Sequence, residues 1–222
     1  MSRRPAAPPA PRRPAPDPPR GQLPEGRCPR CAFPTEGGCL CPALPRLDVS
    51  WRLLLVRHAS ERRRLTNSGR WAAAALTGST VFDHALDDRR SDDDLATLLG
   101  PGPVWLLFPS PHPAVPPGPP PRTLVVPDAT WSQARRMVQR LAPLASLPRL
   151  GLPPPRPGPR LRQPPRAGGM STLEAVAGAA ELLGDAAAAA ALRRLHQAAV
   201  EKALRLKGMW PPAGAHHLPE DR

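Results

Sequence analysis

The chain has 222 residues, of which 41% are apolar, enough to build the core of one catalytic domain but not of two large ones. No apolar run in the sequence is long enough to span a membrane, and no apolar stretch follows the basic residues near the N-terminus, as a secretory signal requires. We therefore expect a cytoplasmic protein without a membrane-spanning segment.

The composition is strongly basic. Lysine and arginine number 31 against 18 aspartates and glutamates, which gives a formal net charge of +13. Such an excess favours a polyanionic partner, because phosphate contacts then contribute much of the affinity. However, only Lys202 and Lys207 are lysines, and alanine, proline and glycine are abundant, a pattern typical of a genome-wide coding bias. The charge therefore supports a nucleic-acid partner without deciding it.

The N-terminal segment, residues 1–26, consists of little but proline, alanine and arginine. It can bury almost no apolar surface, so we expect a disordered tail.

Residues 27–46 contain every cysteine of the chain, arranged as CxxC and CxC pairs. The four are Cys28, Cys31, Cys39 and Cys41. Zinc binds four thiolates tetrahedrally, and four protein ligands leave no open coordination position. We therefore predict a zinc-binding knuckle with a structural ion. An iron–sulfur cluster, which uses the same ligand type, and unrelated free thiols are the alternatives.

Residues 47–207 alternate apolar runs with helical patterns, which predicts an α/β domain with a mostly parallel sheet. The short continuous runs at 51–56, 104–108 and 123–126 are expected to be buried strands. The remaining segments are predicted to be loops at 109–121 and 153–165, a solvated turn and helix start at 87–94, and a flexible tail at 208–222.

Capping residues mark where helices begin. Thr130 and Gln133 can form a capping box after Asp128, and Ser171 and Glu174 can form another. The predicted helices cover residues 71–76, the segment that follows Thr130, residues 171–183, and residues 185–207, with Asp185 as the cap of the last one.

Polar residues follow the predicted strands at the point where each strand ends. His58, Pro109-Ser110 and Asp128 each come just after a predicted strand. Ligands of parallel α/β sheets bind beyond the carboxyl ends of the strands. These residues therefore indicate an active site at that edge of the sheet.

The segment Val126-Pro-Asp-Ala-Thr-Trp-Ser-Gln-Ala-Arg-Arg-Met137 resembles the signature of the DTW-domain family of tRNA-uridine aminocarboxypropyltransferases. The family is named after an Asp-x-Thr-Trp core, here Asp128, Thr130 and Trp131. Other family marks occur in the same order, namely the two cysteine pairs, His58-Ala-Ser-Glu61, Arg64, Thr66-Asn-Ser-Gly-Arg70, Leu106-Leu-Phe-Pro-Ser110, and the stretch from Leu161-Arg162 to Ser171-Thr-Leu-Glu-Ala175. The resemblance covers the chain from about Cys28 to the C-terminal helices.

This resemblance implies a fold and a reaction. The fold is a SPOUT-like α/β domain with a knotted C-terminal part that binds S-adenosylmethionine. The reaction transfers the 3-amino-3-carboxypropyl group of S-adenosylmethionine to N3 of a tRNA uridine and releases methylthioadenosine. The partner is then tRNA.

The chemistry requires a base, because the N3–H of uridine is weakly acidic and must lose its proton as N3 attacks. By resemblance Asp128 accepts this proton or holds the uracil edge, although an aspartate here can also simply cap the following helix. Trp131 either stacks on a base or packs into the core. His58 and Glu61 orient the substrate or are hydrogen-bonded structure.

The other site residues fall into two predicted groups. The cofactor-binding group is Phe108, Pro109, Ser110, Ser171 and Thr172. The substrate-binding group is Arg64, Asn67, Arg70, Thr130 and Arg135. Arginines in the second group suit phosphates or the cofactor carboxylate, which a guanidinium binds bidentately, or else belong to a solvated helix face.

Two other functions remain open. A SPOUT-type RNA methyltransferase would use the same cofactor but transfer methyl and release S-adenosylhomocysteine. A zinc-knuckle RNA-binding protein would lack catalysis altogether, and it leaves the polar residues at the strand ends without a role.

Overall fold

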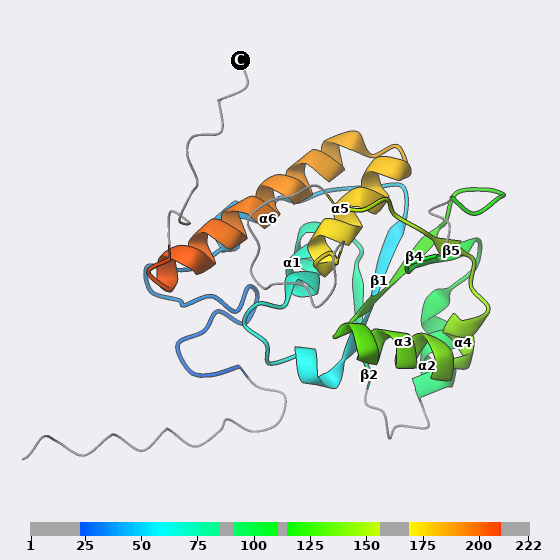
Figure 1. Cartoon of the computed structure of the whole chain (residues 1–222), viewed down its shortest axis with the longest axis horizontal. Helices are drawn as coiled ribbons and strands as arrows, with labels where there is room; N and C mark the ends of the chain where they lie inside the picture. The colour runs from blue at the N-terminus through cyan, green and yellow to red at the C-terminus, as the bar shows by residue number, and fades with distance from the viewer. Residues whose placement is uncertain (1–22, 85–90, 111–114, 156–168, 210–222) are drawn as a thin grey trace, which may run out of the picture.

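The computed structural model describes residues 23–84, 91–110, 115–155 and 169–209 (Figure 1). At its centre is a five-stranded sheet with the order β2-β1-β4-β3-β5, in which every neighbouring pair is parallel. The strands are β1 (Arg52–His58), β2 (Thr80–His84), β3 (Val104–Leu107), β4 (Thr123–Asp128) and β5 (Arg149–Leu150). The predicted α/β class and parallel sheet are confirmed.

The three apolar runs correspond to β1, β3 and β4, whereas the two edge strands β2 and β5 were not predicted. Strand β2 alternates half-buried with exposed side chains until His84, and β5 has only two residues. Neither forms a continuous apolar run, because an edge strand needs burial on fewer sides than a central one.

Helices cover both faces of the sheet (Figure 1). The α-helices are α1 (Ser68–Ala75), α2 (Ser91–Leu99), α3 (Trp131–Arg140), α4 (Ala142–Ala145), α5 (Thr172–Leu182) and α6 (Ala186–Leu206), with short 3₁₀ turns η1 (Cys41–Ala43) and η2 (Ala59–Glu61). Helices α1, α5 and α6 lie on one face, and α2, α3 and α4 lie on the other.

Side chains of the central strands alternate between two apolar clusters. In β1, Leu53 and Leu55 pack with α1, α5 and α6, whereas Leu54 and Val56 pack with α2, α3 and α4. This alternation is the ordinary two-residue period of a strand. It explains why these runs are apolar throughout, since a strand covered on both faces has no solvated side.

The cysteine-bearing segment packs into the first of these clusters. Phe33 contacts Trp71 of α1, with ring centroids 5.6 Å apart. The indole Nε1 of Trp71 donates a hydrogen bond to the carbonyl oxygen of Cys31 at 2.8 Å. The predicted knuckle, residues 27–46, therefore shares its core with α1 rather than folding around its own.

Most predicted helix starts agree with the structure. The capping boxes of α3 and α5 are both present. Helix α1 begins at Ser68, three residues before the predicted start, because the side chain of Asn67 accepts a hydrogen bond from the Arg70 amide and caps it.

The cap predicted for the last helix is wrong. Asp185 occupies the N-cap position of α6, but its side chain makes no capping hydrogen bond. Its Oδ2 instead accepts a hydrogen bond from the indole Nε1 of Trp51 at 2.7 Å. Because Trp51 lies 134 residues away in the sequence, no local pattern predicts this contact.

Several predictions fall on segments outside the described residues. These segments include nearly all of the predicted N-terminal and C-terminal tails, and residues 156–168 between β5 and α5. A knot depends on the path of that connection, so the SPOUT-like knot stays a prediction. Among the described helices, none is long and apolar enough to cross a membrane.

Candidate active site and metal site

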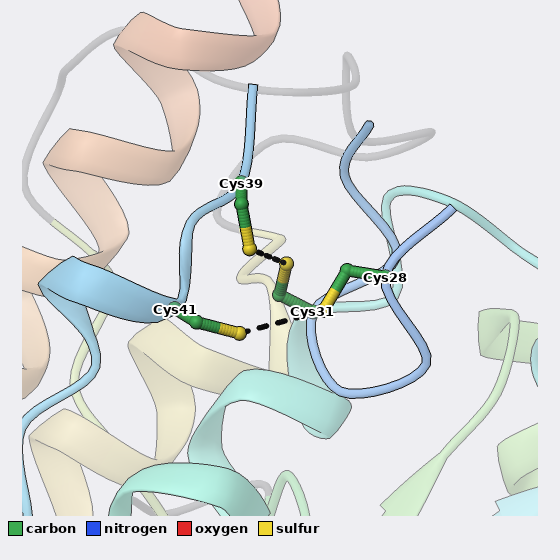
Figure 2. A group of neighbouring side chains, drawn as sticks. All are labelled: Cys28, Cys31, Cys39 and Cys41. Carbon is green, nitrogen blue, oxygen red and sulfur yellow. Dashed lines mark hydrogen bonds between the residues drawn. The ribbon is translucent and has the colours of Figure 1, made fainter. Parts of the chain in front are cut away.

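The four cysteine sulfurs converge on one point (Figure 2). The Sγ atoms of Cys28 and Cys41 lie 3.5 Å apart, those of Cys31 and Cys39 lie 3.7 Å apart, and all four lie within 4.8 Å of one another. Four sulfurs at the zinc–sulfur distance of about 2.3 Å lie roughly 3.8 Å apart in a tetrahedron. The cluster therefore has the donor type and spacing of a four-thiolate metal site.

Backbone hydrogen bonds fix the CxxC turn that brings Cys28 and Cys31 together. The amide of Ala32 donates to the Cys28 carbonyl oxygen at 2.8 Å, and Ala32 adopts the left-handed conformation with a φ of 65°. Backbone N–H groups, that of Cys31 first, lower the pKa of Cys28 to about 6. Burial raises the pKa of Cys31 and Cys41. A cation is what allows several crowded sulfurs to ionise together.

The carboxyl ends of β1, β3 and β4 meet at one edge of the sheet, as predicted, because these strands are parallel. Side-chain alternation nevertheless separates two of the predicted site residues. Asp128 follows Leu124 and Val126 and lies on the α1 and α5 side, whereas His58 follows Leu54 and Val56 and lies on the α3 side. In the described residues no hydrogen bond joins Asp128 to His58.

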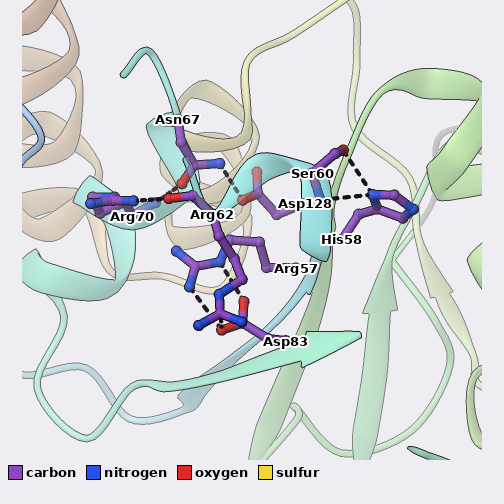
Figure 3. Close-up of polar contacts among 8 residues, drawn as sticks. All are labelled: Arg57, His58, Ser60, Arg62, Asn67, Arg70, Asp83 and Asp128. Carbon is purple, nitrogen blue, oxygen red and sulfur yellow. Dashed lines mark hydrogen bonds and ion pairs between the residues drawn. The ribbon is translucent and has the colours of Figure 1, made fainter. Parts of the chain in front are cut away.

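Asp128 is 3% exposed and links β4 to α1 and α5. Figure 3 shows its contact with Asn67. Its Oδ2 accepts a hydrogen bond from Asn67 Nδ2 at 2.5 Å, and its Oδ1 accepts one from Thr172 Oγ1 at 2.7 Å. Burial raises the pKa of Asp128, whereas the hydrogen bonds from Asn67 and Thr172 lower it. Asp128 does not cap helix α3, because the N-cap is Thr130.

His58 lies in a second polar cluster at the end of β1 (Figure 3). Its Nδ1 is 2.8 Å from Ser60 Oγ and accepts a hydrogen bond from the Ser60 amide at 3.2 Å. The neighbouring Glu61 is 3% exposed and pairs with Arg64 Nε at 3.1 Å. Burial lowers the pKa of His58, so its ring is neutral near pH 7.

The predicted phosphate-binding arginines differ in what they contact. Arg70 donates to the carbonyl oxygens of Arg62 at 2.5 Å and Pro29 at 3.3 Å, and so connects η2 to the cysteine segment. Arg64 is held by Glu61. Arg135 is exposed on α3. Of these three, Arg135 is the one that faces solvent without a hydrogen bond in the described residues.

Trp131 lies at the surface and not in the core. It is 40% exposed and stacks on Phe108, with ring centroids 5.8 Å apart and an interplanar angle of 8°. The guanidinium of Arg149 lies over the Phe108 ring, 5.7 Å from its centroid. An exposed aromatic stack beside a cation is a surface on which a nucleobase can stack. Pro109 and Ser110 continue from Phe108 at the same edge.

The comparison with protein families decides which group this architecture belongs to. A family model described as the DTW domain matches residues 25–204, most of the chain. The chain belongs to the DTW-domain family. This is the domain of tRNA-uridine aminocarboxypropyltransferases, and it makes the protein a member of a family of enzymes that act on tRNA. No solved structure gives a significant match to the chain.

The three residues that give the DTW domain its name do different things in this fold. Asp128 points to the α1 and α5 side, Thr130 caps α3, and Trp131 stacks at the surface. Their closeness in sequence therefore does not put them in one cluster. What they share is the junction between β4 and α3, which lies at the carboxyl edge of the sheet.

Two residues that contact the predicted site, and one ion pair outside it, were not predicted from the sequence. Ser60 and Gln133 connect His58 to the α3 cap, through a hydrogen bond of 3.3 Å from Gln133 Nε2 to Ser60 Oγ. The capping box was a signal for Gln133, but nothing local connected it to Ser60. Asp83 of β2 binds Arg57 bidentately, at 2.7 and 3.1 Å, and no sequence pattern indicated that pair.

Gly69 has a packing reason for lacking a side chain. A Cβ atom there would lie 2.6 Å from Asp128 Cγ and 2.7 Å from its Oδ2. We expect Gly69→Ala to lower the free energy of unfolding by about 1–3 kcal/mol, the usual cost of overpacking, although alanine is otherwise the better helix former. Chemical denaturation of both proteins measures the difference.

The matched control is Gly178→Ala in α5. A Cβ atom at Gly178 would meet only the end of the Leu152 side chain, at 3.3 Å, which can move aside. This substitution should be neutral or slightly stabilising. Equal stability of the two variants would contradict the close packing of Gly69 against Asp128.

Proposed function

We propose that the protein transfers the 3-amino-3-carboxypropyl group of S-adenosylmethionine to N3 of a uridine in tRNA, giving acp3U and methylthioadenosine. The observation that carries this proposal is the DTW-domain match over residues 25–204. The gathering of polar residues at the carboxyl edge of the parallel sheet supports it, because ligands of such sheets bind there. The basic composition agrees with a tRNA partner.

The reaction is a nucleophilic substitution. The lone pair of uridine N3 forms a bond to the γ-carbon of the aminocarboxypropyl group as the N3 proton moves to a base. The bond between that carbon and the sulfonium sulfur breaks, and its electrons stay on sulfur, so methylthioadenosine leaves as a neutral thioether. The positive sulfur activates the leaving group, and the protein has to supply a base, the orientation of the two substrates and exclusion of water.

Asp128 is the proposed base. Its burial raises its pKa, which makes the carboxylate a stronger proton acceptor than an exposed one. Each carboxylate oxygen accepts one hydrogen bond, from Asn67 or Thr172, and keeps a second lone pair that can take the N3 proton. Thr172 begins α5 next to Ser171, and both belong to the proposed wall for S-adenosylmethionine.

The other roles follow from position. We propose that Phe108, Pro109 and Ser110 form the opposite wall for S-adenosylmethionine, with Trp131 stacking on a base of the RNA. The proposed substrate contacts are Arg64, Asn67, Arg70, Thr130 and Arg135, and His58 and Glu61 orient the uracil. The backbone oxygens bound to Arg70 favour a positioning role for it. The SPOUT-like knot remains part of this proposal.

We further propose that Cys28, Cys31, Cys39 and Cys41 hold one structural zinc ion. Four thiolates at tetrahedral spacing leave no position for a substrate. The ion would fix the knuckle against Trp71 and Arg70, and so support the first turn of α1, where Asn67 and Gly69 meet Asp128.

Product analysis tests the proposed reaction. Purified full-length protein is incubated with unmodified tRNA and S-adenosylmethionine, and both the small-molecule product and the digested nucleosides are identified by mass spectrometry. We expect methylthioadenosine in equal amount to a nucleoside heavier than uridine by one aminocarboxypropyl group. S-adenosylhomocysteine with a methylated nucleoside would support the methyltransferase instead. Binding of tRNA without either product would support the non-catalytic protein.

A further inference from the structure

The capping box of α3 is the start of a hydrogen-bond chain whose direction can be assigned. The side-chain Oε1 of Gln133 accepts from the Thr130 amide at 3.0 Å and from Thr130 Oγ1 at 2.6 Å. A backbone N–H can only donate, so this end of the Gln133 amide must be the oxygen. The other end, Nε2, is therefore an NH₂ group, and it donates to Ser60 Oγ at 3.3 Å.

The same reasoning assigns donor and acceptor between Ser60 and His58. Because the Ser60 hydroxyl oxygen accepts from Gln133, its own proton is available for His58 Nδ1, 2.8 Å away. The Ser60 amide also donates to Nδ1, at 3.2 Å. A ring nitrogen that receives two donors carries no proton itself, so the proton of the neutral ring is on Nε2.

The Nε2 atom of His58 is buried and has no hydrogen-bond partner among the described residues. The side chain is itself 9% exposed, so water does not readily replace the missing partner. A buried N–H without an acceptor is unfavourable, and such groups occur where a ligand supplies the acceptor. His58 ends β1, at the edge of the sheet where ligands bind.

Charged groups around His58 agree with a neutral donor. Glu61 raises the pKa of His58, whereas Arg136 and Arg64 lower it, and burial is the largest effect and also lowers it. Burial thus holds the ring neutral, and the hydrogen bonds at Nδ1 select which nitrogen keeps the proton.

We propose that the α3 capping box, acting through Ser60, holds His58 as the tautomer protonated on Nε2, and that this N–H donates a hydrogen bond to a carbonyl oxygen of the target uracil. The proposal rests on the proposed function for the identity of the base. When N3 loses its proton, the negative charge spreads to the two carbonyl oxygens of uracil. A fixed donor there stabilises the developing charge without competing for the proton. Since β1 and β4 are neighbouring strands whose last side chains point to opposite sides of the sheet, the uracil has to lie across their carboxyl ends to meet both Asp128 and His58. His58 is then a hydrogen-bond donor and not the base, and Ser60 and Gln133 are positioning residues.

The first test reads the tautomer directly. In ¹⁵N-labelled full-length protein, two-bond nitrogen–proton correlation spectra distinguish a protonated Nε2 from a protonated Nδ1 for each histidine, and a His58→Gln sample assigns the His58 signals. We expect His58 to be neutral with its proton on Nε2, and the Nε2 proton to shift when unmodified tRNA is added. A charged ring, a proton on Nδ1, or no shift with saturating tRNA would overturn the proposal. This measurement does not depend on any transfer reaction.

The second test separates a donor from a base. In His58→Gln the side-chain NH₂ reaches about where Nε2 lies and can donate, whereas His58→Phe cannot donate. We expect kcat to fall by roughly 10²–10³-fold in His58→Phe, the usual loss for one preorganised donor, and to stay within about tenfold of wild type in His58→Gln. Equal loss in the two folded variants would overturn the donor role. If the wild-type protein makes no product, the proposed reaction fails and the tRNA-induced shift still decides the contact.

The third test addresses the positioning chain. Gln133→Glu keeps an acceptor for Thr130, so the capping box survives, but a carboxylate cannot donate to Ser60 and draws its hydroxyl proton away from His58. We expect the Nδ1 signal of His58 to shift, because Nδ1 loses the Ser60 hydroxyl donor and keeps the Ser60 amide, together with a several-fold loss of kcat and unchanged tRNA affinity. Gln139→Glu makes the same chemical change on the exposed side of α3 and should alter neither. An unchanged Nδ1 signal in Gln133→Glu would overturn the assigned direction of the chain.

Discussion

Replacing Asp128 with asparagine is expected to reduce turnover by roughly 10²–10⁴-fold, because the carboxylate is the proposed acceptor of the uridine N3 proton. The substitution is nearly isosteric. The amide oxygen can still accept from Asn67, and the NH₂ group can donate to Thr172 Oγ1, whose hydroxyl accepts as well as it donates. We therefore expect a folded protein, because the neutral amide keeps both hydrogen bonds and avoids the cost of burying a charge.

Two measurements separate the proposed catalytic role of Asp128 from its role in joining α1, β4 and α5. Single-turnover rates with saturating substrates report the chemical step, and thermal denaturation reports the fold. The matched control is Asp83→Asn near the end of β2, which removes a carboxylate that contacts Arg57 and Arg62. It should leave the rate within about twofold of wild type. A rate above about a tenth of wild type in Asp128→Asn would reject the base assignment, since that is less than ~1.4 kcal/mol of barrier.

The difference in stability between the wild-type protein and Asp128→Asn should also depend on pH, in a defined direction. Burial raises the folded-state pKa of Asp128 above its ordinary value of 3.8, so the folded protein holds this proton more tightly than the unfolded chain does. The stability that results is fully present below the ordinary value and is lost as pH rises through the raised pKa. The variant does not titrate at this position. The melting temperature of the variant should therefore rise relative to that of the wild type as pH rises through this range.

Removal of the proposed zinc ion is expected to have the largest effect on stability. Structural zinc sites supply about 10–16 kcal/mol of binding free energy in zinc-finger peptides, as much as the whole stability of a typical domain, about 5–15 kcal/mol. Cys31 is fully buried in the core cluster that contains Trp71. We therefore expect Cys31→Ser, or chelation of the wild-type protein, to lower the melting temperature by more than about 10 °C and to destabilise α1 along with the knuckle.

Metal analysis accompanies this measurement. We expect close to one zinc per chain in the wild-type protein and much less in Cys31→Ser. Adding zinc back to chelated protein should restore the original melting temperature. If the protein contains iron and has a visible absorption band, the cysteines hold an iron–sulfur cluster and not zinc. Full stability of the metal-free protein would contradict a structural ion altogether.

The sequence by itself determined the features that depend on short-range interactions. The apolar runs of β1, β3 and β4 predict buried strands, since a strand covered on both faces needs apolar side chains at every position. The capping boxes at Thr130 and Ser171 predict helix starts, because each is closed by residues three positions apart. The spacing of the cysteines predicts their convergence for the same reason, since a CxxC turn places two sulfurs together.

Only the tertiary structure decided which distant residues meet. The partners of Asp128 are 61 and 44 residues away, in Asn67 and Thr172, and the partner of Asp185 is Trp51. Strand alternation placed Asp128 and His58 on opposite sides of the sheet, although both end strands at the same edge. These pairings depend on strand order and on which face each helix covers, and both are set by burial of the whole core. No local pattern carries that information, because the energy of each contact is released only when the chain has brought the two elements together.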